Sequence, residues 1–414
     1  MRKTKNNRGT FKLIPRINTK IFGGEIYFSK HNHKKLGEKM SIIHRKRTGL
    51  DNGKNCKRFL YILIYASIGL NIVLSNTVHA HQGKLDENGG HLDRHTGIYH
   101  CHKEGCVLPN VSRSIKITSF NIQFLGNGKN RDNAALASVV ADSDIVLVQE
   151  LVAPPQAGIF PDGTHYNADS EAQAFFTEMT SRGFTYYLSE EDTGTGNEIH
   201  KGSSATEWWV AFYKDQKVDI DDALLNEGLG GFLAQDRSNN PDYERVPYAF
   251  PFKTIDGSLD FVLISVHLKP GPGPTNRDRR KHELESINKW VTLHDTKEKD
   301  FLIVGDLNLY SCDVFTTMNI GQFITLNSSC LNTNTNVNGP EPFDHVLYRP
   351  QFTSEVDKNY GFRVTDLITA MKASWYSHFT HDYPGEPYSH NPFRARYSDH
   401  NPVSFELIVG TDDD

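Results

Sequence analysis

The chain has 414 residues, 37% hydrophobic and 23% charged, so it can form one large globular domain with extensions, and its five cysteines are too few for a disulfide scaffold. Residues 1–80 hold 17 Lys and Arg against three acidic residues, which leaves 28 basic and 47 acidic residues in 81–414 and a net charge there of −19. The negative electrostatic potential of residues 81–414 repels a polyanion on average and argues against a long, positively charged binding groove. A polyanionic ligand would therefore need a local basic patch and a metal ion.

Residues 57–80 have the pattern of a secretory signal peptide. A basic pair precedes the apolar run 59–74, whose 16 residues are fewer than the roughly 20 that a membrane-spanning helix needs. Val78 and Ala80 are small residues placed as expected just before a cleavage site. We therefore expect a protein secreted to the extracellular or periplasmic space, with a signal peptide that ends near Ala80. The alternative is an uncleaved N-terminal anchor.

The segment after the cleavage site, residues 81–106, is dense in histidine, glycine and aspartate and lacks apolar periodicity. It cannot bury a core, so a metal, a disulfide or a neighbouring domain must order it. It resembles the histidine-rich YHYH-type cassette of secreted bacterial proteins. The candidate zinc ligands are His91, His95, His100, His102, Cys101 and Cys106. Their spacing does not match a regular zinc finger, and a disulfide between Cys101 and Cys106 is an equal alternative.

We divide the chain into four parts. Residues 1–80 are an N-terminal extension and signal peptide, with Met40 as an alternative start. The cassette at 81–106 and a linker at 107–113 then lead to the main domain, residues 114–410.

Strand-like and helix-like runs alternate along the main domain, which predicts an α/β layered fold. The predicted strands are Ile115–Phe120, Asp144–Gln149, Thr185–Leu188, Trp208–Tyr213, Arg245–Phe252, Phe261–His267, Phe301–Gly305, His345–Tyr348 and Val403–Ile408. The predicted helices are Asp132–Ala141, Ser170–Arg182 and Asp278–His294. We expect long loops at 221–243 and 311–340, where Gly, Asn, Ser and Thr are in excess.

Polar residues recur where the predicted strands end or begin. They are Asn121, Glu150, His267, Asp306, Asn308, Asp344, Asp399 and His400. Each one alone is typical of a turn or a cap, but sites collect at strand ends in layered α/β folds, and six such ends in one chain indicate a joint site.

These residue types suit the hydrolysis of a phosphodiester. Carboxylates hold a hard divalent cation that neutralises the phosphate oxygens. A histidine held by a carboxylate can take a proton from water or give one to the leaving oxygen. Amide groups can orient the phosphate or the water.

Six segments carry a family resemblance, and they cover residues 115–408. They are SFNIQ (119–123), DIVLVQE (144–150), SVHLKPG (265–271), GDLN (305–308), FDHVL (343–347) and SDHNPV (398–403). In this order they resemble the endonuclease/exonuclease/phosphatase superfamily, and within it the deoxyribonuclease-I-like branch. The resemblance implies an α/β (α+β) four-layer sandwich, in which two packed mixed β-sheets are flanked by helices. It also implies a metal-dependent phosphodiester hydrolase.

The resemblance assigns roles to these positions. Glu150 would bind the catalytic Mg²⁺, with Mn²⁺ or Ca²⁺ as alternatives, and Asn121 and Asp399 would lie near the ion. His267 and His400 would flank the scissile phosphate.

Two acids are implied as partners of the histidines. Asp344 would orient His400, and Glu207 would orient His267. We prefer the version in which the Asp344–His400 pair draws a proton from water and the Glu207–His267 pair donates one to the departing 3′ oxygen, because a carboxylate partner favours imidazolium.

The substrate contacts implied by the resemblance are less complete. Asp306 and Asn308 would hold the water and the phosphate, and Arg245 matches a substrate-contacting arginine. A DNA-contacting tyrosine of the family's nucleases is missing, because Ala205 stands at the corresponding position. This departure puts in doubt the grip on the minor groove of duplex DNA.

A basic run follows the SVHLKPG segment, in which Arg277 and Arg280 are candidate phosphate contacts. The alternative is a solvated helix face that pairs with nearby acids. Cys312 and Cys330 are expected to form a disulfide, as deoxyribonuclease-I-like proteins do in this region. Closing this loop would stabilise the fold by about 3 kcal/mol.

We expect a secreted, monomeric DNA endonuclease, with RNA as a further substrate and without stable membrane association after signal cleavage. A phosphoesterase of the same fold that acts on phospholipid, as a sphingomyelinase does, or on inositol phosphate is the alternative. A non-catalytic binding protein is a third reading, disfavoured because both histidines and the metal-binding glutamate are present.

Overall fold

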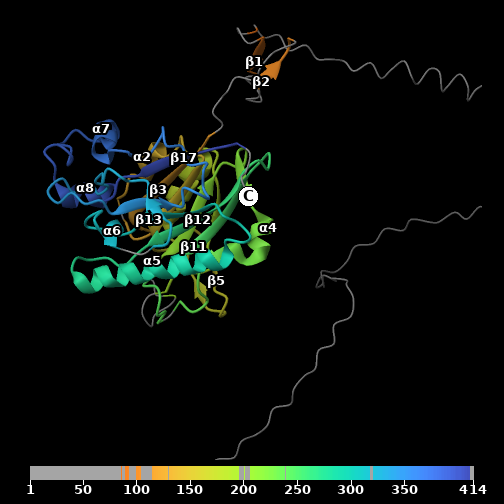
Figure 1. Ribbon diagram of the computed structural model, residues 1–414. Helices are drawn as coiled ribbons and strands as arrows, with labels where there is room; N and C mark the ends of the chain where they lie inside the picture. The colour runs from red at the N-terminus through yellow and green to blue at the C-terminus, as the bar shows by residue number, and fades with distance from the viewer. Residues whose placement is uncertain are drawn as a thin grey trace, which may run out of the picture. The chain divides into compact units, whose positions relative to one another are not determined.

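The computed structural model describes most of the main domain and short pieces of the cassette (Figure 1). The described residues are 85, 89–92, 99–103, 114–128, 130–194, 200, 206–237, 239–317 and 320–410. The predicted extension, signal peptide and linker lie outside them. Among the described residues, no helix combines the length and the apolar character needed to cross a membrane.

The cassette contains one small hairpin in its described part. Strand β1 (Gly90–Leu92) pairs antiparallel with β2 (Tyr99–Cys101), and the register sets His91 opposite His100. His95 and Cys106 lie outside the described residues. Zinc binding by the cassette therefore stays a prediction.

The first large sheet has the strand order β16-β17-β3-β4-β8-β7. Its strands are β16 (Arg363–Val364), β17 (Val403–Ile408), β3 (Ser114–Leu125), β4 (Ile145–Leu151), β8 (Trp208–Tyr213) and β7 (Thr185–Leu188). β3 and β4 run parallel, and the other neighbours are antiparallel, so the sheet is mixed. The apolar side chains of its central strands are buried on both faces, which is why these strands form nearly continuous hydrophobic runs.

The second large sheet has the order β10-β11-β12-β13-β15-β14, and β9 also pairs with β11. Its strands are β10 (Gly231–Phe232), β11 (Tyr248–Thr254), β12 (Asp260–His267), β13 (Phe301–Asp306), β15 (Asp344–Tyr348), β14 (Ile324–Thr325) and β9 (Val218–Ile220). Only β12 and β13 are parallel among these described pairs. This sheet is mixed as well.

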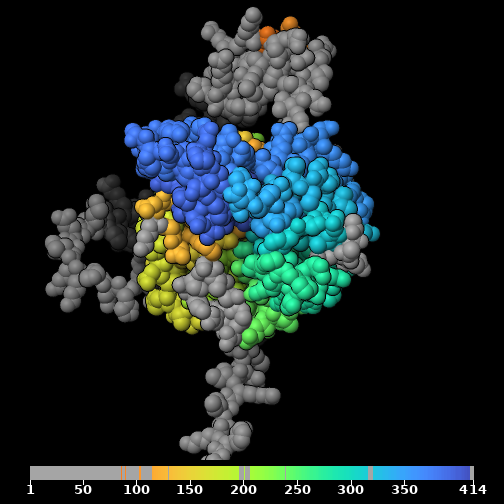
Figure 2. Space-filling view, turned by 90° about the vertical axis from the view of Figure 1, so that its left-hand side faces the viewer, coloured from red at the N-terminus to blue at the C-terminus, as the bar shows by residue number. Residues whose placement is uncertain are grey.

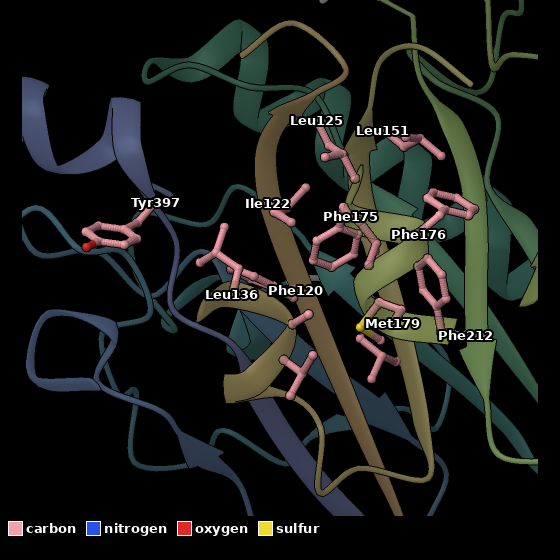
Figure 3. Close-up of a cluster of buried hydrophobic side chains, with 14 of the residues drawn as sticks. Phe120, Ile122, Leu125, Leu136, Leu151, Phe175, Phe176, Met179, Phe212 and Tyr397 are labelled. Atoms are coloured by element: carbon pink, nitrogen blue, oxygen red, sulfur yellow. The ribbon is translucent and has the colours of Figure 1, made fainter. Parts of the chain in front are cut away.

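Three apolar cores hold four layers together. The core between the sheets joins residues such as Ile117 and Leu147 of the first sheet to Leu263 and Val304 of the second. The outer face of the first sheet is covered by α2 (Asn133–Val139), α3 (Ser170–Ser181), α7 (Leu367–His378) and α8 (His390–Arg396). Figure 3 shows Phe175 and Phe176 of α3 directed toward the strands that carry Ile122 and Phe212.

The outer face of the second sheet is covered by α5 (Pro274–His294). Figure 1 shows α5 along one side of the domain and α2 and α7 on the opposite side. Gly273, at φ +98°, turns the chain into α5, and Pro274 takes the first helical position, where its missing N–H costs nothing. The predicted four-layer α/β sandwich with two mixed sheets is therefore confirmed.

The predicted strands are all present, and the three predicted helices are present with ends that differ by a few residues. The two expected long loops contain short elements instead. Residues 221–243 include α4 (Asp222–Leu224), a π-helical turn (Leu225–Leu229) and β10, and residues 311–340 include α6 (Val314–Thr317) and β14. The remaining pair, β5 (Gly158–Ile159) and β6 (His165–Tyr166), forms a small hairpin. These elements are too short for a periodic pattern to reveal them.

Candidate active site

Strand register brings three of the predicted site residues side by side. In the parallel pair β12–β13, His267 is opposite Asp306, and in the antiparallel pair β13–β15, Asp306 is opposite Asp344. All three side chains are buried. The second sheet therefore presents one imidazole and two carboxylates along one edge.

The first sheet contributes its residues through irregular backbone. The β3–β4 register shifts between Asn121 and Leu125, and Glu150 adopts φ +63°. Such irregularities re-aim side chains at the end of a strand. As a result, the Asn121 amide nitrogen donates to Glu150 Oε1 at 3.0 Å and to Asp306 Oδ2 at 3.1 Å, which links the two sheets.

Two histidines meet at one carboxylate oxygen. Asp306 Oδ2 lies 3.5 Å from His267 Nε2 and 3.6 Å from His400 Nε2. The other ring nitrogen of each histidine faces its own acid, with His267 Nδ1 3.0 Å from Glu207 Oε1 and His400 Nδ1 2.8 Å from Asp344 Oδ2. A carboxylate can only accept, so each acid favours a proton on Nδ1 and turns Nε2 toward the centre.

Further contacts fix the two acids. Asp344 Oδ2 also accepts from Thr333 Oγ1 at 2.6 Å, and Thr333 Oγ1 accepts from the Asp344 backbone at 2.9 Å. Glu207 accepts from the Glu150 backbone N–H at 2.6 Å and pairs with Arg245 Nε at 2.9 Å. Both acids are thus held independently of the rings that they face.

The ring pKa values follow from burial opposed by charge. Burial lowers the pKa of His400, but Asp344 and Asp306 outweigh it and raise the pKa well above its ordinary value. Burial and Arg245 lower the pKa of His267, yet Glu207 and Asp306 leave it raised. The same ring and Arg245 overcome burial at Glu207 and lower its pKa. Both imidazoles therefore hold a proton more tightly than a free histidine does.

The sequence profile of the Endonuclease/Exonuclease/phosphatase family matches residues 118–400, a span that contains this whole constellation. The chain belongs to that family. Endonuclease/exonuclease/phosphatase enzymes are hydrolases that act on phosphoester bonds, and they generally depend on a divalent metal.

Several solved structures have a similar fold, and three of them illustrate how different such proteins are. A family protein of Bacteroides thetaiotaomicron matches at a TM-score of 0.43 and 16% identity, over 72% of this chain and 98% of that chain. A mannosyl-6-phosphatase of the same organism matches at 0.42 and 17%, over 71% and 99%. The human Nocturnin catalytic domain matches at 0.42 and 11%, over 71% and 93%. No curated protein sequence matches the chain. Likeness at this level says nothing about the substrate.

The oxygen ligands around Glu150 fit a hard divalent cation. Glu150, Asp306 and Asp399 are carboxylates, and Asp399 Oδ1 is buried without a hydrogen-bond partner. Burial raises the pKa of Glu150 and of Asp306, because charged carboxylates are costly away from water. A bound cation would relieve that cost and would satisfy the free oxygen of Asp399.

Two details bear on the metal ligands. In the observed orientation Asn121 turns its NH₂ group toward the carboxylates and its carbonyl oxygen toward the Gln123 N–H, so it positions Glu150 and Asp306. Direct ligation by Asn121 would require the amide to be reversed. Asp306, Asp344 and His400 form a second group whose ligand atoms lie close enough together to hold a metal.

The remaining predicted residues lie around this centre. The Asn308 side chain donates to the Leu268 carbonyl at 3.1 Å, and its backbone N–H donates to Asp306 Oδ1 at 2.7 Å. Arg245 Nη1 donates to the His267 carbonyl at 3.4 Å. Arg245 therefore braces Glu207 and the end of β12, in addition to any contact with substrate.

The two candidate phosphate contacts on α5 differ in their freedom. Arg277 is 59% exposed, and within the described part of the chain its side chain has only a 4.0 Å ion pair, with Asp278. Arg280 is 3% exposed and donates to the Lys269 and Gly271 carbonyls. Both line a hollow of about 770 Å³ together with Tyr310, just after Asn308. Cys312 and Cys330, a little further along, form the expected disulfide.

Four residues of the site were not expected from the sequence. They are Gln123, Thr333, Arg131 and Arg394. Gln123 Nε2 donates to Asp399 Oδ2 at 2.9 Å, and Arg394 Nη1 approaches the same oxygen at 3.4 Å. Gln123 is the last residue of the SFNIQ segment, so the sequence could have predicted it as a site residue. The other three belong to none of the six segments.

Proposed function

We propose that the protein is a secreted, Mg²⁺-dependent phosphodiesterase that cleaves the P–O3′ bonds of DNA, and also of RNA, as an endonuclease. The observation that carries the proposal is the shared approach of His267 Nε2 and His400 Nε2 to Asp306 Oδ2, with a separate acid behind each ring. Two buried imidazoles that approach one point suit a reaction that needs one proton removed and another supplied.

The His400 pair is the better candidate for the base. Its contact with Asp344 is short and is a hydrogen bond, which fixes Nδ1–H and directs Nε2 at the centre. Asp306 contributes to the raised pKa of this ring, so a cation bound beside Asp306 would favour the neutral ring, whose Nε2 can accept a proton from water. Glu207, in contrast, is shared between His267 and Arg245. We therefore propose that His267 is the ring that delivers a proton to the departing 3′ oxygen.

Glu150 and Asp399, with Asp306 beside them, would hold the metal. The cation supplies positive charge to the nonbridging oxygens of the phosphate. Asn121 and Asn308 orient these carboxylates, since Asn121 donates to Glu150 and the Asn308 backbone donates to Asp306. Asp306 also keeps both Nε2 atoms directed at one point.

Two features support nucleic acid and secretion. Arg277 and Arg280 place positive charge in a hollow next to Asn308, in a main domain that is otherwise acidic. The disulfide between Cys312 and Cys330 is of the kind that persists in an oxidising compartment, in agreement with the signal-like residues before Ala80.

The test is a substrate panel. The purified protein is incubated with plasmid DNA, single-stranded DNA, RNA, sphingomyelin and an inositol phosphate, each with Mg²⁺ and with EDTA. We expect Mg²⁺-dependent cleavage of nucleic acid with 5′-phosphate and 3′-hydroxyl ends. Rapid turnover of the lipid or the inositol phosphate with untouched nucleic acid would show that the substrate assignment is wrong.

A further inference from the structure

A second hollow adjoins the first sheet's part of the site. It measures about 510 Å³ and lies between the end of β3, the loop that follows it and helix α8. Its lining includes Gln123, Phe124, Arg131, Trp375 and Arg394. Figure 2 shows orange residues from the N-terminal part of the domain bordering the blue C-terminal segment. Since Gln123 and Arg394 both contact Asp399, this candidate metal ligand stands at the edge of the hollow.

The walls of the hollow are fixed by a buried ion pair. Arg131 pairs with Glu171 at 2.5 Å and donates to the carbonyls of Ile122, Gln123 and Tyr397. Glu171 in turn accepts from the backbone N–H groups of two loop glycines, each at 2.7 Å. The end of β3 and the end of α8 are therefore tied to one guanidinium, and the hollow has a defined shape without any ligand.

Among the arginines of the lining, Arg394 has the most exposed side chain. Arg131 uses four of its five N–H donors in the contacts above. Arg396 donates to the Asn130 carbonyl, pairs with Asp132 and stacks over Phe379. Arg394 is 39% exposed, and its ion pair with Asp399 spans 3.4 Å, which is longer than a strong charge-assisted hydrogen bond. Arg394 can therefore bind an anion that enters beside the metal site.

The lining also offers the aromatic side chain of Phe124, which is half buried. The Phe124 backbone N–H donates to Glu150 Oε2 at 3.0 Å, so this residue is anchored to the candidate metal ligand. The residue adopts φ +53°, a conformation that few non-glycine residues take and that fixes the direction of its side chain. A base can stack on such a ring whatever its identity.

We propose that this hollow binds one unpaired nucleotide next to the scissile phosphate, with its phosphate on Arg394 and its base against Phe124. The inference rests on the proposed function and adds a strand preference to it. The volume suits a small ligand, and a base that enters the hollow gives up its Watson–Crick partner. Single strands are therefore cleaved faster than duplexes.

The experiment measures kcat/KM in Mg²⁺ for four substrates: a short single-stranded DNA, the same strand annealed to its complement, its RNA counterpart, and bis(para-nitrophenyl) phosphate, which has no base. Wild type should cleave the single strand at least about fivefold faster than the duplex. Arg394→Gln and Phe124→Leu should each lower the ratio of single-strand to bis(para-nitrophenyl) phosphate kcat/KM about tenfold, mainly through KM, which is about 1.4 kcal/mol. Arg394→Lys should recover part of the loss. The RNA arm shows whether the hollow accepts either sugar.

Arg363→Gln is the matched control, because Arg363 is an exposed arginine on β16 that stacks over Tyr360. It removes the same charge and should leave every ratio unchanged. A wild type that cleaves no nucleic acid would overturn the subsite and the proposed function together. Wild type that cleaves duplex faster, or an Arg394→Gln protein whose ratio is unchanged, would overturn the subsite and leave the proposed function standing.

Discussion

Replacing Asp344 by asparagine tests the better-formed histidine pair. Asp344 Oδ2 accepts from His400 Nδ1 at 2.8 Å and from Thr333 Oγ1 at 2.6 Å. An asparagine that keeps its oxygen toward Thr333 also keeps it toward His400 Nδ1, because one oxygen, Oδ2, makes both contacts. The substitution therefore removes the negative charge behind the ring, which makes the ring a weaker base toward water. Replacing a charge-assisted hydrogen bond by a neutral one costs about 1–2 kcal/mol, or about 5–30-fold in kcat.

The assay is kcat on a single-stranded oligonucleotide at saturating Mg²⁺, with circular dichroism to verify the fold. Thr333→Val is the graded companion, because it removes the hydrogen bond to the Asp344 carboxylate, together with the one from the Asp344 backbone N–H, and leaves the charge. It should cost about 1 kcal/mol, or about fivefold. Nitrogen NMR of the His400 ring should show a lower pKa in Asp344→Asn than in wild type, because Asp344 raises that pKa. A folded Asp344→Asn protein with more than about a third of wild-type kcat would refute the reasoning.

Three further predictions follow from the same contacts. Glu150→Gln should raise the Mg²⁺ concentration that gives half-maximal rate by at least about 10–100-fold, because losing even a residue that only hydrogen-bonds to a metal ligand costs that much affinity. An unchanged Mg²⁺ titration would show that Glu150 does not bind the metal. Replacing Cys312 and Cys330 by serine should lower the free energy of unfolding in urea by about 3 kcal/mol, and a loss too small to measure would mean that the disulfide does not constrain the unfolded chain. The pKa of His400 is raised in the folded state. The protonated ring therefore stabilises the fold fully below the unfolded pKa of about 6.5, and this contribution is lost as pH rises through the folded pKa. With EDTA present, the stability gap between wild type and Asp344→Asn should therefore narrow as pH rises above neutrality, and a gap that widens would contradict the assigned charge state.

The sheets and the candidate metal and histidine residues could be predicted from the sequence for one physical reason. Strands covered on both faces form continuous apolar runs, and each run here stops at a polar residue that cannot be buried alone. Runs such as 145–149 and 301–305 therefore mark both the strand and the residue that follows it, Glu150 or Asp306. Parallel pairing then brings those ends to a common edge.

Contacts that depend on irregular backbone geometry could not be predicted from the sequence. Arg131 binds carbonyl groups whose positions are set by the irregular end of β3, and no side-chain pattern encodes them. Thr333 reaches Asp344 from a segment with composition typical of a loop. Helix α7 does carry a period-four signal in Leu367, Met371 and Trp375, capped by Asp366, and this pattern could have predicted it.

Helix α8 has no such pattern, because it is seven residues long and contains a proline. Arg394, which it presents to the hollow beside Asp399, was therefore invisible until the chain was folded.

The most direct measurement compares wild type, His267→Ala and His400→Ala on one single-stranded oligonucleotide, each with Mg²⁺ and with EDTA. The two rings share one oxygen of Asp306, so each substitution alone should reduce Mg²⁺-dependent hydrolysis by about 10²–10⁴-fold, the usual worth of a positioned proton donor or acceptor. EDTA should abolish hydrolysis by the wild-type protein. Full Mg²⁺-dependent hydrolysis by a folded His400→Ala protein would contradict a reaction centre built on two imidazoles.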